Sequence, residues 1–551
     1  MNWELERHAN FPGVEGPVLV CVMDGVGIGR HDDSDAVWLA QTPHLDRLRE
    51  LALTTRLTAH GKSVGMPSDG DMGNSEVGHN ALGAGRTFDQ GAKLVAGAVA
   101  SGSLFEDDAW KALTQHVRTS HQPMHFMGLL SDGNVHSHID HLFALVRRCD
   151  QEEIERVRIH ILLDGRDVPE TSALEYVDPL ENLLAEISRK ENRDYRIASG
   201  GGRMRITMDR YEADWAMVER GWKAHVLGEA RGFPSAREAI EILRDEEPGL
   251  SDQWLPPFTI VESDGSPVGP IRDHAAVVFF NFRGDRAIEI CQAFEAETFS
   301  HFERGPRPDI LYAGMMQYDG DLKIPERFLV NPPDIDRTLG EYLARNRVPQ
   351  LAISETQKFG HVTYFWNGNR SGYFDDQYEN YIEIPSDTLP FDEHPEMKAA
   401  EITDRLIREL QTGQYRHARI NYANGDMVGH TGHLDAAVQA VESVDREIGR
   451  LLPLVEKMNG AILVTADHGN ADCMFDIDAK TGEAIRDAGG KIAAKTSHTL
   501  NPVPLYLHAP GHGLQLRADA QDAPLARISA TLLHLLGLRA PEDYEASLIE
   551  S

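Results

Sequence analysis

The chain has 551 residues, enough for two or more domains that each bury a core. Hydrophobic residues make up 41% and charged residues 26% of it, the proportions of a soluble globular protein. The formal net charge of −33 argues against a nucleic acid or an anionic membrane as a partner, so an anionic substrate would need metal ions or clustered arginines. Four scattered cysteines without a CxxC pair, no apolar leader and no run near the ~18–20 residues of a membrane span predict a cytoplasmic protein.

The first predicted element is a buried parallel strand over residues 18–23, an apolar, β-branched run that ends at Asp24. Open α/β sheets place their ligands at such carboxyl ends of strands. Thr42 and Pro43 predict a helix to about Leu53, with Thr42 as the N-cap and Pro43 at the first helical position.

Ser75 is the one nucleophile in the next stretch, MGNSEVGH (72–79), and the run that follows it, residues 77–82, can start a helix. At a helix N-terminus a serine lies beside free backbone N–H groups and the positive end of the dipole, which hold a phosphate well. The alternative is that Ser75 is only the N-cap. No His/Asp triad pattern adjoins it, so any activation of its hydroxyl should come from a metal.

From about residue 90 a second α/β unit is predicted. Strand-like runs at 123–130, 157–163, 195–198 and 275–280 each lead into a polar loop, with helical segments between them. Arginine binds phosphate and carboxylate through a planar fork, so arginines in these loops predict an anion pocket, the alternative being exposed arginines that only aid solubility. The loops carry Arg166, Arg203, Arg210, Arg283 and Arg286.

A linker is predicted at 330–333, followed by a helix over about 396–410 and by strands at 419–423 and 461–465. Acids and histidines follow these strands, and oxygen and nitrogen ligands without thiolate favour Mn²⁺, Mg²⁺ or Zn²⁺. With Ser75 they suffice for two metals, although a lone Asp is often a helix cap and a lone His a surface or core residue. The candidate ligands are Asp24, Asp426, His430, Asp467, His468 and His498; His79 and His361 could support them, and His433 is expected at the surface.

Seven motifs resemble, in order, those of the cofactor-independent phosphoglycerate mutases, whose metal-binding half belongs to the alkaline-phosphatase superfamily. They are MGNSEVGH, LLSDGNVHSH, LLDGRDVP, NFRGDR, SETQKFGHVT, GDMVGH and TADHGNAD, and the resemblance covers essentially the whole chain. It implies an α/β fold in which an alkaline-phosphatase-like metal domain, residues 1–89 and 332–551, carries an inserted α/β phosphotransferase domain, residues 90–331, that clamps the substrate.

The resemblance also implies site residues. Asp426, His430 and His498 would bind one metal, and Asp24, Ser75, Asp467 and His468 the other, with Ser75 as the phosphorylated nucleophile. Lys358 would steady phosphate. The substrate would be bound by His136, Arg166, Asp167, Arg203, Arg210, Arg283 and Arg286, with Asp167 as the base toward the glycerate hydroxyl. Two departures stand out: the 69–71 stretch is one residue longer than the common bacterial pattern, and Arg203 and Arg210 lie seven residues apart rather than six, so that either Arg203 or Arg205 could face the substrate.

The implied activity is the interconversion of 3-phosphoglycerate and 2-phosphoglycerate in glycolysis and gluconeogenesis, through a phosphoserine intermediate at a two-metal site. Manganese is the first expectation for the two divalent ions, with Mg²⁺ or Co²⁺ as alternatives, and 2,3-bisphosphoglycerate is not expected as a cofactor. The expected protein is a monomer whose partner is phosphoglycerate. The rival hypotheses are a metal-dependent phosphatase, a phosphopentomutase-like enzyme and a non-catalytic, metal-stabilised scaffold.

Overall fold

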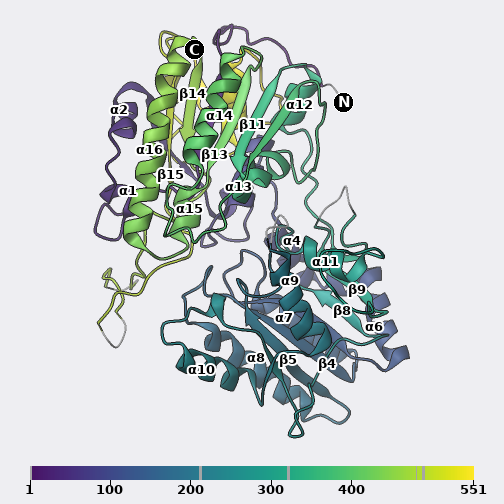
Figure 1. Ribbon diagram of the computed structural model, residues 1–551. Coiled ribbons are helices and arrows are strands. Elements are labelled where there is room, and N and C mark those ends of the chain that lie inside the picture. Colours follow the sequence, from purple (N-terminus) through teal and green to yellow (C-terminus); the bar gives the residue numbers. More distant parts are fainter. Residues whose placement is uncertain (1–2, 210–213, 319–322, 479–480, 487–489) are drawn as a thin grey trace. The chain divides into compact units, whose positions relative to one another are not determined.

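The chain forms two compact units, each built around one eight-stranded sheet (Figure 1). The computed structural model describes residues 3–551 apart from 210–213, 319–322, 479–480 and 487–489. The split unit combines Met1–Gln90 with Asp334–Ser551, and the inserted unit is Gly91–Pro333. Both units mix helices with mainly parallel strands, so the predicted α/β class is confirmed.

The sheet of the split unit runs in the order β12-β11-β13-β1-β14-β15-β2-β17. Strand β1 lies parallel to β13 on one side and β14 on the other, whereas β15 is antiparallel to both β14 and β2. The carboxyl ends of β13, β1 and β14 therefore meet at one edge. The strands of this unit are β1 (Val18–Met23), β2 (Leu53–Thr58), β11 (Gln350–Glu355), β12 (Glu379–Ile384), β13 (His417–Tyr422), β14 (Ala461–Thr465), β15 (Val503–His508), β17 (Ala523–Pro524) and, in a separate pair, β16 (Gln515–Leu516) and β18 (Ile549–Glu550).

Helices α14 and α16 cover one face of this sheet, as Figure 1 shows. Helix α16 buries residues three or four positions apart, including Ala437, Val441, Val444 and Ile448, as expected for an amphipathic helix against a core. The helices of the split unit are α1 (Ala36–Leu39), α2 (Pro43–Leu51), α3 (Ser75–Ala84), α12 (Leu339–Arg345), α13 (Thr356–Gly360), α14 (Ala399–Gln411), α15 (Asn424–Gly429), α16 (Leu434–Lys457) and α17 (Arg527–Leu535), with short turns η1 (Gly61–Val64) and η4 (His361–Phe365).

The inserted unit has the strand order β10-β9-β8-β3-β4-β5-β7-β6, in which β7 alone pairs antiparallel, with β5. The parallel set brings the carboxyl ends of β8, β3, β4 and β5 to one edge. Its strands are β3 (Met124–Leu130), β4 (Arg156–Leu163), β5 (Asp194–Gly202), β6 (Arg231–Phe233), β7 (Phe258–Ile260), β8 (Ala276–Phe279), β9 (Leu311–Met316) and β10 (Phe328–Val330). Its helices are α4 (Gly91–Ser101), α5 (Ser103–Glu106), α6 (Asp108–Ser120), α7 (Ile139–Gln151), α8 (Ala173–Ser188), α9 (Trp215–Trp222), α10 (Ala236–Glu246) and α11 (Ile288–Glu295), with short turns η2 (Lys223–Leu227) and η3 (Asp252–Trp254).

Two local predictions differ from the structure. Helix α2 ends at Leu51, not near Leu53, because the chain from Leu53 onward pairs with β15, and the Thr42 side chain makes no capping hydrogen bond. The predicted linker overlaps β10 by one residue, since Val330 still pairs with Met316. Among the described residues, no helix is both long and apolar enough to cross a membrane.

Candidate active site

Three neighbouring strands deliver acidic side chains to one edge of the split unit. Asp24 directly follows β1, Asp467 lies two residues after β14, and Asp426 lies in α15, which begins two residues after β13. All three residues are 3% exposed or less. The turn behind Asp24 requires glycine, because Gly25 has a φ of +74° and a Cβ there would lie 2.5 Å from the backbone N of Asp426. The turn after β1 and helix α15 can approach this closely only with glycine at that point.

Ser75 lies beside these acids, as the first residue of α3. The N-cap is Asn74, whose side chain accepts a hydrogen bond from Val77 N at 3.1 Å, so the alternative in which Ser75 is only the cap is wrong. Ser75 Oγ instead lies 2.9 Å from His468 Nε2 and 3.2 Å from Asp24 Oδ1. The hydroxyl is thus buried within the acid and histidine cluster.

Three histidines point their Nε2 atoms into the cluster. Each turns its Nδ1 toward a backbone carbonyl: His430 toward Thr496 O at 2.6 Å, His498 toward Gly73 O at 2.9 Å and His468 toward Gly469 O at 3.3 Å. This is the usual arrangement of a metal-binding histidine, in which an outer N–H donates to a carbonyl and leaves the inner nitrogen free to ligate.

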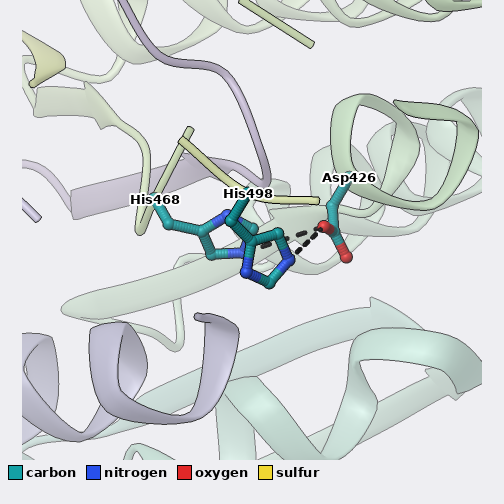
Figure 2. Close-up of side chains that lie close together, drawn as sticks. All are labelled: Asp426, His468 and His498. Carbon is teal, nitrogen blue, oxygen red and sulfur yellow. Dashed lines mark hydrogen bonds and ion pairs between the residues drawn. The ribbon is translucent and has the colours of Figure 1, made fainter. Parts of the chain in front are cut away.

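Two groups of donor atoms are close enough to hold metal ions. Asp426, His468 and His498 form one group and Asp24, Asp467 and His468 the other, with the donor atoms of each group within 4.8 Å of one another. In Figure 2 the rings of His468 and His498 face Asp426, whose Oδ1 lies 3.8 Å and 3.2 Å from their Nε2 atoms. His430 Nε2 lies 3.0 Å from the same oxygen. The buried oxygen and nitrogen donors and the outward Nδ1 contacts together fit divalent metals.

The electrostatics of the cluster also favour cations. Burial acts to raise the pKa of Asp24 and of Asp426, but the Lys358 ammonium and the neighbouring histidines bring both well below their usual range. Burial acts to lower the pKa of His468, but Asp467 and Asp24 outweigh it and raise that pKa to about 9. Asp24 and Asp426 are therefore ionised, and their carboxylates favour positive charge at this site, whether a proton on His468 or a metal ion in its place.

Lys358 enters the cluster from α13. Its ammonium lies 2.5 Å from Ser75 Oγ, 2.8 Å from Asp24 Oδ1 and 2.7 Å from Asp426 Oδ2, and the side chain is 1% exposed. A cation at hydrogen-bond distance from the serine can neutralise charge that develops on a group bound there.

In the inserted unit, a second buried cluster lies where β4 and β5 end. Arg203 is 1% exposed and forms ion pairs with Asp167 and, at 2.8 Å, with Asp164. Asp164 Oδ1 also accepts from the backbone N–H groups of Arg166 and Asp167 at 3.2 and 3.0 Å. Arg205 is exposed and lies over the ring of Trp254, so it is Arg203 that faces the cluster.

The NFRGDR loop after β8 completes this second cluster. Asp285 Oδ1 lies 3.1 Å from Arg283 Nε and 3.6 Å from His136 Nδ1. Burial and the surrounding guanidinium groups hold the pKa of His136 well below its usual value, so its imidazole is neutral. Arg286 donates to Met208 O at 2.6 Å. The cluster thus combines buried arginines with carboxylates, which suits an anion that also carries hydroxyl groups.

Comparisons with known proteins show the family of the chain. The model of the metalloenzyme superfamily matches residues 16–540. A probable 2,3-bisphosphoglycerate-independent phosphoglycerate mutase of Leptospira interrogans is 55% identical over 97% of each chain, and the corresponding mutase of Trypanosoma brucei brucei is 51% identical over 99% of each. The chain belongs to the 2,3-bisphosphoglycerate-independent phosphoglycerate mutases. It is therefore an isomerase and a metalloenzyme.

The fold of this mutase agrees with a solved member of its family. A crystal structure of Leishmania mexicana phosphoglycerate mutase at low cobalt concentration is 48% identical, covers 99% of each chain and superimposes with a TM-score of 0.96. The likeness extends over both units, so the family fold includes the inserted unit as well as the split one.

Some residues of the mutase clusters were not among the sequence candidates. Asn421 donates to Asp24 Oδ2 at 2.7 Å and Asn470 donates to Asp426 Oδ1 at 3.1 Å. Asn470, Asp164 and Asp285 stand inside the motifs TADHGNAD, LLDGRDVP and NFRGDR, which could have singled them out, whereas Asn421 lies within β13 and had no such signal. His79 supports the cluster as anticipated, with Nδ1 3.2 Å from Asp467 Oδ2. Arg210 lies outside the described residues.

Proposed function

We propose that this mutase interconverts 3-phosphoglycerate and 2-phosphoglycerate through a phosphoserine at Ser75. The observation that carries the proposal is the position of Ser75 Oγ, buried at the N-terminus of α3 within 3.2 Å of Asp24, His468 and Lys358. The names of relatives that are 47–55% identical support the choice of substrate.

In the first half-reaction, Ser75 Oγ bonds to phosphorus while the bond from phosphorus to the glycerate oxygen breaks. The released glycerate oxygen gains a proton, and the serine hydroxyl loses one. In the second half-reaction, the other glycerate hydroxyl attacks phosphoserine, loses its proton and restores Ser75. Lys358 would neutralise charge on the phosphoryl oxygens in both directions.

Two divalent ions, manganese first, would be held by Asp426, His430 and His498 and by Asp24, Ser75, Asp467 and His468. When bound, such ions lower the pKa of a coordinated hydroxyl and stabilise negative charge on phosphoryl oxygens. Residues 1–89 and 332–551 would form this metal domain.

Residues 90–331 would form the domain that retains glycerate between the two half-reactions. Arg166, Arg203, Arg283, Arg286 and His136, with Arg210, would bind its carboxylate and the phosphate, and Asp167 would accept the hydroxyl proton. Retention is what separates a mutase from a phosphatase, because a glycerate that escapes leaves phosphoserine to react with water. We further propose a cytoplasmic monomer that acts without 2,3-bisphosphoglycerate.

Product analysis tests the proposal. Purified protein loaded with Mn²⁺ is incubated with 3-phosphoglycerate, without bisphosphoglycerate, and the products are followed by phosphorus NMR. Formation of 2-phosphoglycerate supports the mutase. Free phosphate with glycerate would indicate a phosphatase. A second incubation uses ribose 1-phosphate, and turnover of this substrate alone would indicate a phosphopentomutase-like enzyme. No turnover of either substrate would indicate a scaffold.

A further inference from the structure

Five polar side chains form one continuous hydrogen-bonded chain through the interior of the inserted unit. The distances are 2.9 Å from His125 Nδ1 to His160 Nε2, 2.7 Å from His160 Nδ1 to Ser199 Oγ, 2.7 Å from Ser199 Oγ to His225 Nδ1, and 3.1 Å from His225 Nε2 to Thr207 Oγ1. The residues come from β3, β4, β5, η2 and the loop after β5, and each is at most 1% exposed.

The three imidazoles of this chain are neutral. Burial lowers the pKa of His125 and of His225 to about 3 and holds the pKa of His160 well below its usual value. A neutral imidazole donates one hydrogen bond and accepts one, so within each histidine one ring nitrogen is the donor and the other the acceptor.

The direction of the first two hydrogen bonds follows from the atom at the start of the chain, His125 Nε2. His125 Nε2 is buried and has no hydrogen-bond partner among the described residues. A buried N–H without an acceptor is rarer than an unused lone pair, so His125 Nε2 carries the lone pair. His125 Nδ1–H then donates to His160 Nε2, and His160 Nδ1–H donates to Ser199 Oγ. The chain continues from Ser199 Oγ through His225 to Thr207 Oγ1.

Thr207 is held in a strained conformation. Its φ of +67° lies in the left-handed region that a β-branched residue rarely adopts, so surrounding contacts must impose it. Its N–H donates to Met217 O at 3.0 Å, and a Cβ on Gly221 would lie 2.0 Å from Thr207 Oγ1. The hydroxyl therefore fits into a space bounded by Gly221 and His225.

Thr207 is connected to the arginine cluster through the residue that follows it in the chain. Met208, the next residue, is buried, and its carbonyl accepts the hydrogen bond from Arg286 Nη1 at 2.6 Å. The backbone angles of Thr207 set where this carbonyl points, and the carbonyl helps to fix the guanidinium of Arg286, which is itself only 5% exposed.

We propose that Thr207 is a positioning residue for Arg286, held in place by the buried chain of His125, His160, Ser199 and His225. The proposal rests on the proposed function, in which Arg286 binds the anionic substrate. If the chain only satisfied buried polar groups, its loss would lower stability without a specific effect on substrate affinity.

The test compares Thr207→Val, which keeps the shape but loses the hydroxyl, with Thr207→Ser, which keeps the hydroxyl. Thr114→Val is a matched control, because Thr114 is a buried threonine of the same unit whose hydroxyl donates to the carbonyls of Trp110 and Lys111 within α6. We expect Thr207→Val to raise KM for 3-phosphoglycerate about tenfold, the factor that corresponds to the loss of one buried hydrogen bond. The value of kcat should stay within about twofold of that of the unaltered protein. Thr207→Ser and Thr114→Val should keep the KM of the unaltered protein.

A double-mutant cycle shows whether the effect passes through Arg286. In an Arg286→Ala background, Thr207→Val should raise KM less than about twofold, because coupled residues are not additive. The same tenfold rise in both backgrounds, or an unchanged KM for Thr207→Val, would overturn the proposal. If Thr207→Val does not fold, Ser199→Ala takes its place in the same cycle. If neither variant folds while Thr207→Ser does, the hydrogen-bonded chain serves only stability, and the proposal is overturned. A wild-type protein that makes no 2-phosphoglycerate would instead overturn the proposed function.

Discussion

The side chain of Asn74 accepts a hydrogen bond from the backbone N–H of Val77 at 3.1 Å and thereby caps α3. A capping serine would direct its hydroxyl at those same N–H groups. Because Asn74 satisfies one of them, Ser75 Oγ can turn toward Asp24, His468 and Lys358. Two adjacent polar residues thus divide structural and chemical roles between them.

This division predicts opposite effects of two neighbouring substitutions. Ser75→Ala should abolish mutase activity while changing the free energy of unfolding by less than about 1 kcal/mol, since it removes one small hydroxyl. Asn74→Ala should lower the free energy of unfolding by about 1 kcal/mol through loss of the cap, and should retain measurable turnover. Mass spectrometry after rapid quenching with substrate should place a phosphate on Ser75, and normal turnover by Ser75→Ala would refute the covalent route.

Metal binding can be tested apart from catalysis. Equilibrium dialysis should find two Mn²⁺ ions per chain, and extended chelation should remove both the ions and the activity. His498→Ala should lose at least one ion, because it removes a donor whose Nε2 lies 3.2 Å from Asp426 Oδ1. His433→Ala is the matched control, an exposed histidine near Asp392 that should leave the count at two. Unchanged binding by both variants would contradict the assignment.

Much of the fold could be predicted because buried parallel strands have a simple sequence pattern. The bounds of β1 and β14 agree with the predicted strands at 18–23 and 461–465, since continuous apolar, β-branched runs have few other uses. Their positions in one sheet also explain why Asp24 and Asp467, far apart in the chain, lie close together.

Contacts that depend on long-range packing could not be predicted. Asn421 approaches Asp24 because β13 pairs with β1, a register that no local pattern specifies. The pairing of Arg203 with Asp164 and Asp167, and the turn at Thr207 with its φ of +67°, likewise depend on elements distant in sequence. Local propensity gives the element, and tertiary packing decides which side chain it presents.

The buried histidine chain predicts acid sensitivity of the inserted unit. The pKa of His125 and of His225 is about 3 in the folded state, against about 6.5 unfolded, and the pKa of His160 is also lowered by burial. Below pH ~6.5 these histidines take up protons in the unfolded chain but not in the folded one. Their effect on the free energy of unfolding is therefore absent above that pH, and the free energy of unfolding falls as the pH decreases below it.

Each such histidine should lower the free energy of unfolding of the inserted unit by about 1.4 kcal/mol for each unit by which the pH falls below ~6.5. The three histidines of the chain should together lower it by about 4 kcal/mol per pH unit. Hydrogen exchange of β3–β5 peptides between pH 7.0 and 5.0, corrected for intrinsic rates, measures this opening free energy. His225→Gln should reduce the slope by about 1.4 kcal/mol per pH unit, the contribution of one such histidine. A slope that does not change would mean that the imidazoles are already protonated in the folded state.

The last prediction concerns Arg283, whose Nε lies 3.1 Å from Asp285 Oδ1 in the NFRGDR loop. If the inserted unit retains glycerate between the half-reactions, Arg283→Ala should spare phosphoserine formation but weaken the hold on glycerate. Loss of a charge-assisted contact of about 1.5–3 kcal/mol corresponds to roughly a 10- to 150-fold weaker grip. Glycerate should then escape, and the ratio of phosphate release to isomerisation should rise.

Arg205→Ala, which removes an exposed arginine of the same unit, should leave that ratio unchanged. Both products are measured from 3-phosphoglycerate. Because the substitution leaves Asp285 without this partner, the double variant with Asp285→Asn controls for the unbalanced buried charge. Should phosphate release and isomerisation fall by the same factor in both variants, Arg283 acts in initial binding, and its role in retention is refuted.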